Sequence, residues 1–295
     1  MAFVFLNGAL VPEEEALLPV DDRAVLFGDG AYETMRSYSG RFFRFPEHLR
    51  RLRSTLAGMR LRLAVTDEAI TRGAMDLIRA NDIPQARLRL TVTGGRHDGA
   101  IRLRRGHEPN LILTAVRLMP PAAELYRDGV DVLISPWPMH SASPLPRIKT
   151  VNRLQHLMAK ETALEQGAYE SLFVDETGGV LEGTATNVFF MLDGALRTAS
   201  LDGPLLAGVT RDAVLEVARA AGLTVVEGRV GVEELPRATE AFLTSTTLEL
   251  LPIRAVDGRP VGEGRPGPLW RMLFERFRAK VGAEIGLALD PLPPG

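Results

Sequence analysis

Strand-like and helix-like patterns alternate along the whole chain, and a proline-containing break near residue 120 separates them into two groups. The first group opens with Asn7-Gly8 between two apolar stretches, which is the strongest short signal for a β-hairpin. In the break, residues 119–124 (Met-Pro-Pro-Ala-Ala-Glu), neither the strand-like pattern nor the helix-like pattern continues. Because 295 residues suit one large domain or two modest ones, the pattern predicts a mixed α/β (α+β) chain of two domains.

The expected division gives a smaller N-terminal α/β domain, residues 1–120, and a larger C-terminal α/β domain, residues 130–295, joined by a linker at 121–129. In the first domain we expect strands at 32–38, 42–45, 87–93 and 111–118, a helix with Pro46 at its first position, and a helix from Thr66 or Asp67 to about Asn81. In the second domain we expect strands at 130–135, 171–174, 188–192, 223–227 and 241–244, a turn at 175–179, and helices at 151–166, from Thr210, and at 269–281.

Composition excludes several classes of protein. Apolar residues make up 45% of the chain and the formal charge is −2, which does not favour nucleic acid or an anionic membrane as a partner. The absence of cysteine excludes disulfides and thiolate metal sites, and the five histidines (48, 97, 107, 140, 156) lack metal-ligand spacing, so no metal is expected. No apolar run approaches the roughly 20 residues of a membrane helix, and the start lacks a basic signal region. We therefore expect a cytoplasmic protein.

One lysine stands out because lysines are so rare. The chain has three lysines against 32 arginines, and Lys149 lies in the segment Arg-Ile-Lys-Thr-Val-Asn-Arg-Leu, residues 147–154. An arginine can replace a lysine on a solvated surface, but its guanidinium stays protonated and cannot form a Schiff base. Lys149 is therefore the first candidate for covalent chemistry, although a lone lysine can equally be an ordinary surface residue.

Three clusters of small or polar residues in the second half suit an anionic ligand. Residues 206–211 place unpaired amides at a helix start, and residues 244–247 gather four hydroxyls after an apolar strand. Residues 181–187 place the Glu182 carboxylate at a strand end. Each cluster alone is better explained as a helix cap, a turn or a strand terminus. Together with a reactive lysine they supply what pyridoxal phosphate needs: an amine, a phosphate cradle and an acid for the ring nitrogen.

Motifs in a fixed order then identify a family. They are Asp22-Arg23 with residues 26–33 (Leu-Phe-Gly-Asp-Gly-Ala-Tyr-Glu), residues 48–52 (His-Leu-Arg-Arg-Leu), Lys149 followed by Asn152-Arg153-Leu154, Glu182-Gly183 with Asn187, Val209-Thr210, and Thr246-Thr247. Over nearly its whole length the chain resembles the fold-type IV, or class IV, pyridoxal-phosphate aminotransferases. That group contains branched-chain aminotransferases, D-amino-acid aminotransferases and aminodeoxychorismate lyases.

The resemblance implies a role for each matching residue. Lys149 would carry the cofactor as a Schiff base and move the substrate proton, Arg51 would hold the phosphate, and Glu182 would pair with the pyridine nitrogen. The cofactor-binding set implied is Arg51, Lys149, Glu182, Thr186, Asn187, Val209, Thr210, Thr246 and Thr247. The candidate substrate-pocket residues are Tyr32, Arg36, Arg87 and Arg89. Tyr32 can alternatively be a core aromatic residue, and the arginines can alternatively form a charged strand face. The resemblance also implies a cofactor at the domain interface and a homodimer.

The substrate is less constrained by the sequence. D-amino-acid enzymes of this group typically carry Thr-Arg-Gly where this chain has Thr93-Gly94-Gly95, so the expected carboxylate-binding arginine is absent unless Arg96 or His97 replaces it. We expect a transaminase for small aliphatic or branched-chain L- or D-amino acids and 2-oxo acids. The alternative is an aminodeoxychorismate lyase, which eliminates pyruvate to give 4-aminobenzoate and is suggested by Asn152-Arg153-Leu154. A phosphate-binding scaffold without catalytic activity is a third hypothesis.

Overall fold

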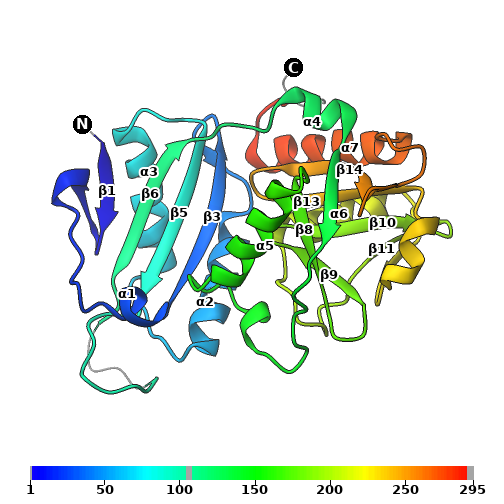
Figure 1. Cartoon of the computed structure of the whole chain (residues 1–295). Coiled ribbons are helices and arrows are strands. Elements are labelled where there is room, and N and C mark those ends of the chain that lie inside the picture. Colours follow the sequence, from blue (N-terminus) through cyan, green and yellow to red (C-terminus); the bar gives the residue numbers. More distant parts are fainter. Residues whose placement is uncertain (1, 104–107, 291–295) are drawn as a thin grey trace. The chain divides into compact units, whose positions relative to one another are not determined.

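The computed structural model describes residues 2–103 and 108–290, and it divides into two compact units (Figure 1). The first unit comprises Met1–Met119 and Ile148–Arg153, and the second comprises Pro120–Arg147 and Leu154–Gly295. This differs from the expected domains in two respects. Residues 148–153 group with the first unit, and the expected linker contains helix α4 (Ala123–Asp128). Residues 291–295 of the expected second domain, and His107, lie outside the described residues.

The first unit is built on an antiparallel sheet in the order β2-β1-β6-β5-β3-β4. The hairpin expected at Asn7-Gly8 is confirmed, because Leu6 pairs with Ala9 across it. Asn7 has φ 49° and Gly8 has φ 101°, the positive values that a tight two-residue hairpin requires. The strands are β1 (Phe3–Leu6), β2 (Ala9–Pro12), β3 (Gly30–Tyr38), β4 (Arg41–Phe42), β5 (Ala86–Thr93) and β6 (Leu111–Arg117), and a short helix, α1 (Arg23–Phe27), precedes β3.

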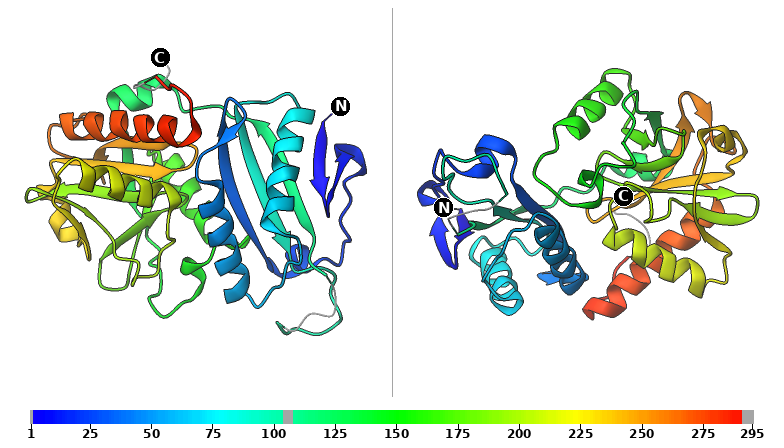
Figure 2. Two further views of the ribbon diagram at one scale, coloured as in Figure 1. Left: turned by 180° about the vertical axis from the view of Figure 1, so that it is seen from behind. Right: turned by 90° about the horizontal axis from the view of Figure 1, so that it is seen from below.

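Two helices cover one face of this sheet, as both views in Figure 2 show. They are α2 (Phe45–Gly58) and α3 (Asp67–Ala80), and Thr66 caps α3 as expected, its hydroxyl accepting from the Ala69 amide at 3.2 Å. Leu49, Leu52 and Leu56 of α2 are buried in the core, and their spacing in the sequence places them on one face of the helix. The strand expected at 42–45 is wrong beyond residue 42, because Phe45 already begins α2 and packs into the core.

The segment Ile148–Arg153 lies along the free edge of β3. The Tyr32 amide donates to the Lys149 carbonyl at 2.9 Å, and the Val151 amide donates to the Gly30 carbonyl at 2.9 Å. Ala31 and Thr150 form an antiparallel bridge between these bonds. Because these residues pair as a strand, the helix expected from Val151 begins only at Leu154, as α5 (Leu154–Glu165). The pairing fixes the backbone of Lys149 against the first unit.

The second unit contains a sheet in the order β12-β11-β10-β13-β14-β7-β8-β9, in which β9 also pairs with β10. That extra pairing closes the run from β10 to β9 into a ring of strands, with β7 parallel to both β14 and β8. The strands are β7 (Val130–Ile134), β8 (Glu170–Val174), β9 (Val180–Gly183), β10 (Asn187–Leu192), β11 (Ala195–Thr198), β12 (Val225–Glu227), β13 (Glu240–Ser245), β14 (Glu249–Val256) and β15 (Arg259–Pro260).

Helices α6 (Val209–Ala220) and α7 (Pro268–Ile285) pack on each other, and both contact β13. Their starts agree with the helices expected from Thr210 and at 269–281. The central strand β14 was not expected from the sequence, and neither were β9 and β11 as separate strands. Within the described residues, no helix has the length and apolarity needed to cross a membrane.

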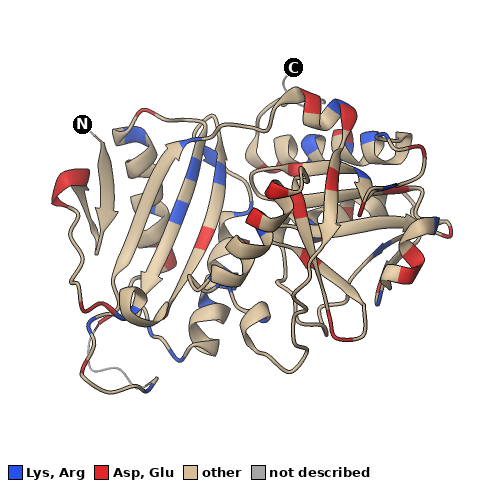
Figure 3. Ribbon diagram, viewed as in Figure 1, with Lys and Arg blue, Asp and Glu red and all other residues tan. Residues whose placement is uncertain are grey.

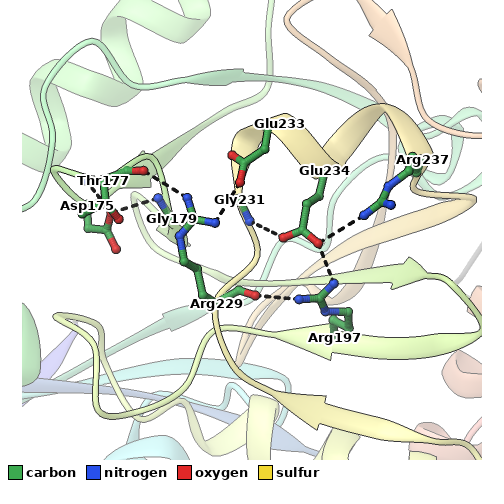
Figure 4. Close-up of polar contacts among 9 residues, drawn as sticks. All are labelled: Asp175, Thr177, Gly179, Arg197, Arg229, Gly231, Glu233, Glu234 and Arg237. Atoms are coloured by element: carbon green, nitrogen blue, oxygen red, sulfur yellow. Dashed lines mark hydrogen bonds and ion pairs between the residues drawn. The ribbon is translucent and has the colours of Figure 1, made fainter.

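The turn expected at 175–179 is confirmed and is tied to a neighbouring polar network (Figure 4). The Asp175 carboxylate accepts from the Thr177 amide at 2.8 Å and from the Gly179 amide at 2.9 Å. Arg229 donates to the Thr177 carbonyl at 3.0 Å and to Glu233 at 2.8 Å. These exposed contacts hold the hairpin that leads into β9, the strand that carries Glu182.

Candidate active site

In the first unit, Lys149 and Arg89 share one aromatic ring. The Lys149 Nζ lies 4.8 Å from the centre of the Tyr32 ring, and the Arg89 guanidinium carbon lies 4.0 Å from it. Tyr32 is only 9% exposed, so the ring is a fixed surface for both cations. Burial lowers the pKa of the Arg89 guanidinium from its ordinary value; Tyr32 opposes this, and the neighbouring Arg87 and Arg153 add to the lowering. An amine, a phenol and a guanidinium thus meet at one place.

Further arginines lie on the same face of the first sheet, the face opposite α2 and α3. Arg36 pairs directly with Arg87 across β3 and β5, and Thr34 pairs with Arg89. Figure 3 shows basic positions, coloured blue, on these neighbouring strands of the first sheet. Like charges directly opposite each other are destabilising in a sheet. Such a face therefore suits an anionic group, and a substrate carboxylate is a group of that kind.

Glu33 faces the helices instead and pairs with α2. Its carboxylate accepts two bonds from Arg51, at 2.8 Å and 2.7 Å, and one from His48 Nδ1 at 2.8 Å. Burial raises the pKa of Glu33, but the charge and hydrogen bonds of Arg51, together with those of His48, outweigh it and lower the pKa from 4.5 to about 2. Burial lowers the pKa of the His48 ring from its ordinary value, and the hydrogen bond and charge of Glu33 oppose that effect. Arg51 is thus oriented by Glu33, and its expected phosphate contact stays a prediction.

In the second unit, a carboxylate, an amide and a hydroxyl lie in a row across three strands. Glu182 of β9 pairs with Asn187 of β10, which pairs with Thr244 of β13. The Glu182 Oε2 accepts from the Leu206 amide at 3.1 Å and from the Asn187 side-chain amide at 3.4 Å. Glu182 is 6% exposed, so its carboxylate is held rather than solvated. Cross-strand partners project on one face, which brings the predicted Glu182 and Asn187 together.

The amino end of α6 adjoins this row. Gly208 is the N-cap of α6, and a Cβ at Gly208 would lie 1.9 Å from the Asn187 Oδ1. Only glycine permits so close an approach of the helix start to Asn187. The first helical residues, Val209 and Thr210, are buried, and the helix dipole there favours a negative charge. Val209 and Thr210, which are both predicted to bind the phosphate, therefore lie near the row formed by Glu182, Asn187 and Thr244.

The turn after β13 carries the hydroxyl cluster. The Ser245 hydroxyl lies 3.5 Å from that of Thr247 and accepts from the Leu248 amide at 3.2 Å. The buried Thr244 hydroxyl has no hydrogen-bond partner within residues 2–103 and 108–290. A buried polar atom without a partner points to a ligand atom that satisfies it. The row and the adjacent turns therefore fit the carboxylate and anion-binding groups that pyridoxal phosphate needs, and the phosphate contacts of Thr246 and Thr247 stay a prediction.

Thr244 belongs to the hydroxyl cluster predicted at residues 244–247, but the family motif matches only Thr246 and Thr247, so Thr244 is not in the predicted cofactor-binding set. The strand pattern could have identified Thr244, because Thr244 is the last polar position of β13 on the face that it shares with Asn187. Thr186, by contrast, was expected to bind the cofactor, and its hydroxyl donates to Glu170 at 3.4 Å. Its cofactor contact stays a prediction.

The predicted residues thus fall into two sets, one in each unit. Tyr32, Arg36, Arg51, Arg87, Arg89 and Lys149 belong to the first unit, and Glu182, Thr186, Asn187, Val209, Thr210, Thr246 and Thr247 belong to the second. The two alternatives for a carboxylate-binding residue are already engaged: Arg96 pairs with Asp21 at 3.0 Å, and His97 packs edge-on against Phe27. Among the described residues, no group of three or more acidic or histidine side chains could hold a metal ion.

Comparison with known proteins decides the family. The family model for class IV amino-transferases matches residues 30–256. The chain belongs to the class IV aminotransferase family. A putative branched-chain-amino-acid aminotransferase of Methanocaldococcus jannaschii is 31% identical over 96% of this chain and 98% of its own length. A D-alanine aminotransferase of Bacillus licheniformis is also 31% identical, over 95% of this chain and 98% of its own length.

Solved class IV aminotransferases share the fold. The branched-chain amino acid aminotransferase of Escherichia coli superimposes with a TM-score of 0.90 at 28% identity, covering 98% of this chain and 96% of that one. The T.th. branched-chain enzyme with pyridoxamine 5′-phosphate gives a TM-score of 0.88 at 27% identity, covering 97% and 95%. The expected fold class is confirmed. These relatives are named as transaminases, so they do not favour the lyase alternative.

Proposed function

We propose that the chain is a pyridoxal-phosphate-dependent transaminase that moves an amino group between a small amino acid and a 2-oxo acid. The observation that carries the proposal is the placement of Lys149, whose backbone is pinned to β3 and whose amine lies on Tyr32 beside Arg89. The family match and the cofactor named in a similar solved structure support it. When bound, pyridoxal phosphate supplies an electron sink for the carbon from which a proton is removed.

Each residue then has a defined task. Lys149 Nζ would hold the cofactor aldehyde, and as a free amine it would accept and return the proton of the substrate Cα. The Arg89 guanidinium contacts the same Tyr32 ring as the Lys149 amine. The Glu182 carboxylate, fixed by Asn187 and the Leu206 amide, would pair with the ring nitrogen and keep a proton on it.

The phosphate is assigned to groups that hold anions. They are the Arg51 guanidinium, the amides at the start of α6 (Val209 and Thr210), and the hydroxyls and amides of Thr246 and Thr247. To these we add the buried Thr244 hydroxyl, which lacks a hydrogen-bond partner among the described residues. Arg51 keeps a fixed direction because Glu33 takes two of its N–H groups. A phosphate bound by Arg51 would therefore meet a guanidinium whose direction is already fixed rather than a mobile side chain.

The substrate carboxylate is assigned to the arginine face of the first sheet. Arg89 is nearest to the amine through Tyr32, and Arg36 and Arg87 lie two residues further along their strands, roughly 7 Å away. The relatives include both branched-chain and D-alanine aminotransferases, so we propose a small aliphatic amino acid without assigning its hand.

The test is a panel of L- and D-amino acids offered to the purified protein with pyridoxal phosphate and 2-oxoglutarate. Transamination predicts that the visible band of the bound cofactor converts to the pyridoxamine form with a subset of the panel, together with 2-oxo acid release. An Arg89→Met variant should lose roughly tenfold or more in apparent substrate affinity while keeping the band. A protein that releases pyruvate from aminodeoxychorismate and transaminates none of the panel would overturn the proposal.

A homodimer in the cytoplasm completes the proposal, with no nucleic acid or membrane as partner. Its support is an exposed apolar surface on α1, where Val25 is 67% exposed, Leu26 46% and Phe27 41%. Neighbouring exposed apolar side chains of this kind suit a protein–protein interface. We propose that a second copy of this chain covers them.

A further inference from the structure

We infer that Glu170, a residue outside every motif used above, is a positioning residue that fixes the loop carrying Glu182 and Asn187. The inference rests on the proposed function, because it concerns the acid that serves the ring nitrogen. Glu170 begins β8 and is only 2% exposed. A buried carboxylate must be matched by donors, and the donors here come mainly from one loop.

The loop in question, residues 183–186, joins β9 to β10. Its ends are the cross-strand pair Glu182 and Asn187, and the Gly183 amide donates to the Thr186 carbonyl at 2.7 Å. The position of this loop therefore sets the distance between the Glu182 and Asn187 side chains and the direction of each.

Glu170 binds the loop through both of its carboxylate oxygens. Its Oε1 accepts from the Thr184 hydroxyl at 2.6 Å and from the Ser171 amide at 2.9 Å. Its Oε2 accepts from the Thr186 hydroxyl at 3.4 Å. The Thr184 bond has the short length of a hydroxyl bonded to an ionised carboxylate. Two hydroxyls, one on each side of Ala185, are thus held by one buried side chain.

Gly183 allows this arrangement. A Cβ at Gly183 would lie 2.2 Å from the Thr186 Oγ1 and 3.0 Å from the Glu170 Cγ. Gly183 pairs with Leu172, and Glu170 is two residues from Leu172 on the same strand. Because successive residues of a strand project to opposite faces, Glu170 lies on the face opposite to the Glu182 side chain. Glu170 therefore contacts the loop from the face of the strands opposite to the Glu182 side chain, and it does not occupy the face on which Glu182 lies.

Lys160 supplies a positive charge near Glu170. The Lys160 Nζ lies 4.0 Å from the Glu170 Oε1, and it also donates to the Tyr169 carbonyl. Lys160 is one of only three lysines in the chain. An ammonium at this distance compensates a buried negative charge without taking part in the loop contacts.

The test compares Glu170→Gln and Thr184→Val with wild type in three measurements: the dissociation constant for pyridoxal phosphate, the pH at which the visible band changes, and the melting temperature of the apoprotein. Both variants should weaken cofactor binding roughly tenfold and shift the titration of the band, since each removes a hydrogen bond to a charged group. Thr184→Ser keeps the hydroxyl and should restore both properties. The matched control is Glu165→Gln, an exposed carboxylate on α5 that should leave all three unchanged.

The outcomes separate the inference from the proposed function. If Glu170→Gln and Thr184→Val lower only the melting temperature while affinity and titration stay at wild-type values, Glu170 is structural and the inference is overturned. It is equally overturned if Thr184→Ser behaves as Thr184→Val does. A wild-type protein that forms no visible band with pyridoxal phosphate would instead contradict the proposed function itself.

Discussion

At the scale of single residues, each ionisable group of the site has a hydrogen-bonding or aromatic partner that fixes its position. Glu33 has no exposed surface and takes bonds from Arg51 and His48. Lys149 and Arg89 share Tyr32, and Glu182 takes an amide from Leu206. These contacts fix the positions of the groups that are proposed to bind the cofactor and the substrate.

Glu33→Gln should destabilise the protein by roughly 3 kcal/mol at neutral pH, because Arg51 loses a buried partner. Since folding lowers the Glu33 pKa from 4.5 to about 2, the carboxylate stabilises the fold fully above pH 4.5 and loses that effect as the pH falls toward 2. The difference in free energy of unfolding between wild type and variant should therefore shrink below pH 4.5. Urea unfolding between pH 3 and 7 measures it. A difference that stays constant across this range, or one matched by Glu14→Gln on the exposed η1 (Glu13–Glu15), would contradict the account.

At the scale of elements, the site depends on how closely backbones approach one another. The start of α6 lies against Asn187 because Gly208 has no side chain, and the Ile148–Arg153 segment lies against β3 because its amides and carbonyls pair there. In both places local backbone geometry, rather than a side chain alone, decides where the functional groups stand.

Gly208→Ala should push the start of α6 away from Asn187, because the new methyl would lie 1.9 Å from the Asn187 Oδ1. We expect a loss of about 1–3 kcal/mol in stability and a weaker affinity for pyridoxal phosphate. Thermal unfolding of the apoprotein and a cofactor titration measure the two effects. Gly228→Ala is the matched control, because its Cβ would meet nothing nearer than Val226 Cγ1 at 3.8 Å. Equal behaviour of the two variants would refute the close-approach argument.

At the scale of the whole molecule, the sequence predicted the class of fold and most helices and strands, since the hairpin at Asn7-Gly8, the Thr66 cap and the α2 leucines are local signals. It did not predict strand β14, an apolar run in the middle of the sheet that carries no alternation. It also placed the Lys149 segment in the second domain, because nothing in its residues shows that their amides pair with β3. Motif order selected Glu182 and Asn187, whereas Thr244 needed the register of β13.

The proposed homodimer makes a prediction at the same scale. Light scattering of the eluted protein should give about twice the chain mass of 32.2 kDa. Val25→Asp places a charge on the exposed apolar surface of α1 and should shift the protein toward the monomer. Val226→Asp, on the exposed edge strand β12, should leave the mass unchanged. A monomeric wild type, or a Val25→Asp variant that remains fully dimeric, would count against this interface.

The most direct measurement is the chemical location of the cofactor. Because the chain has only Lys149, Lys160 and Lys280, borohydride reduction of the protein loaded with pyridoxal phosphate, followed by digestion and mass spectrometry, can place the adduct without ambiguity. The account predicts a single phosphopyridoxyl group on Lys149 and its loss, with the visible band, in Lys149→Ala. An adduct on Lys160 or Lys280 with Lys149 unmodified would contradict it.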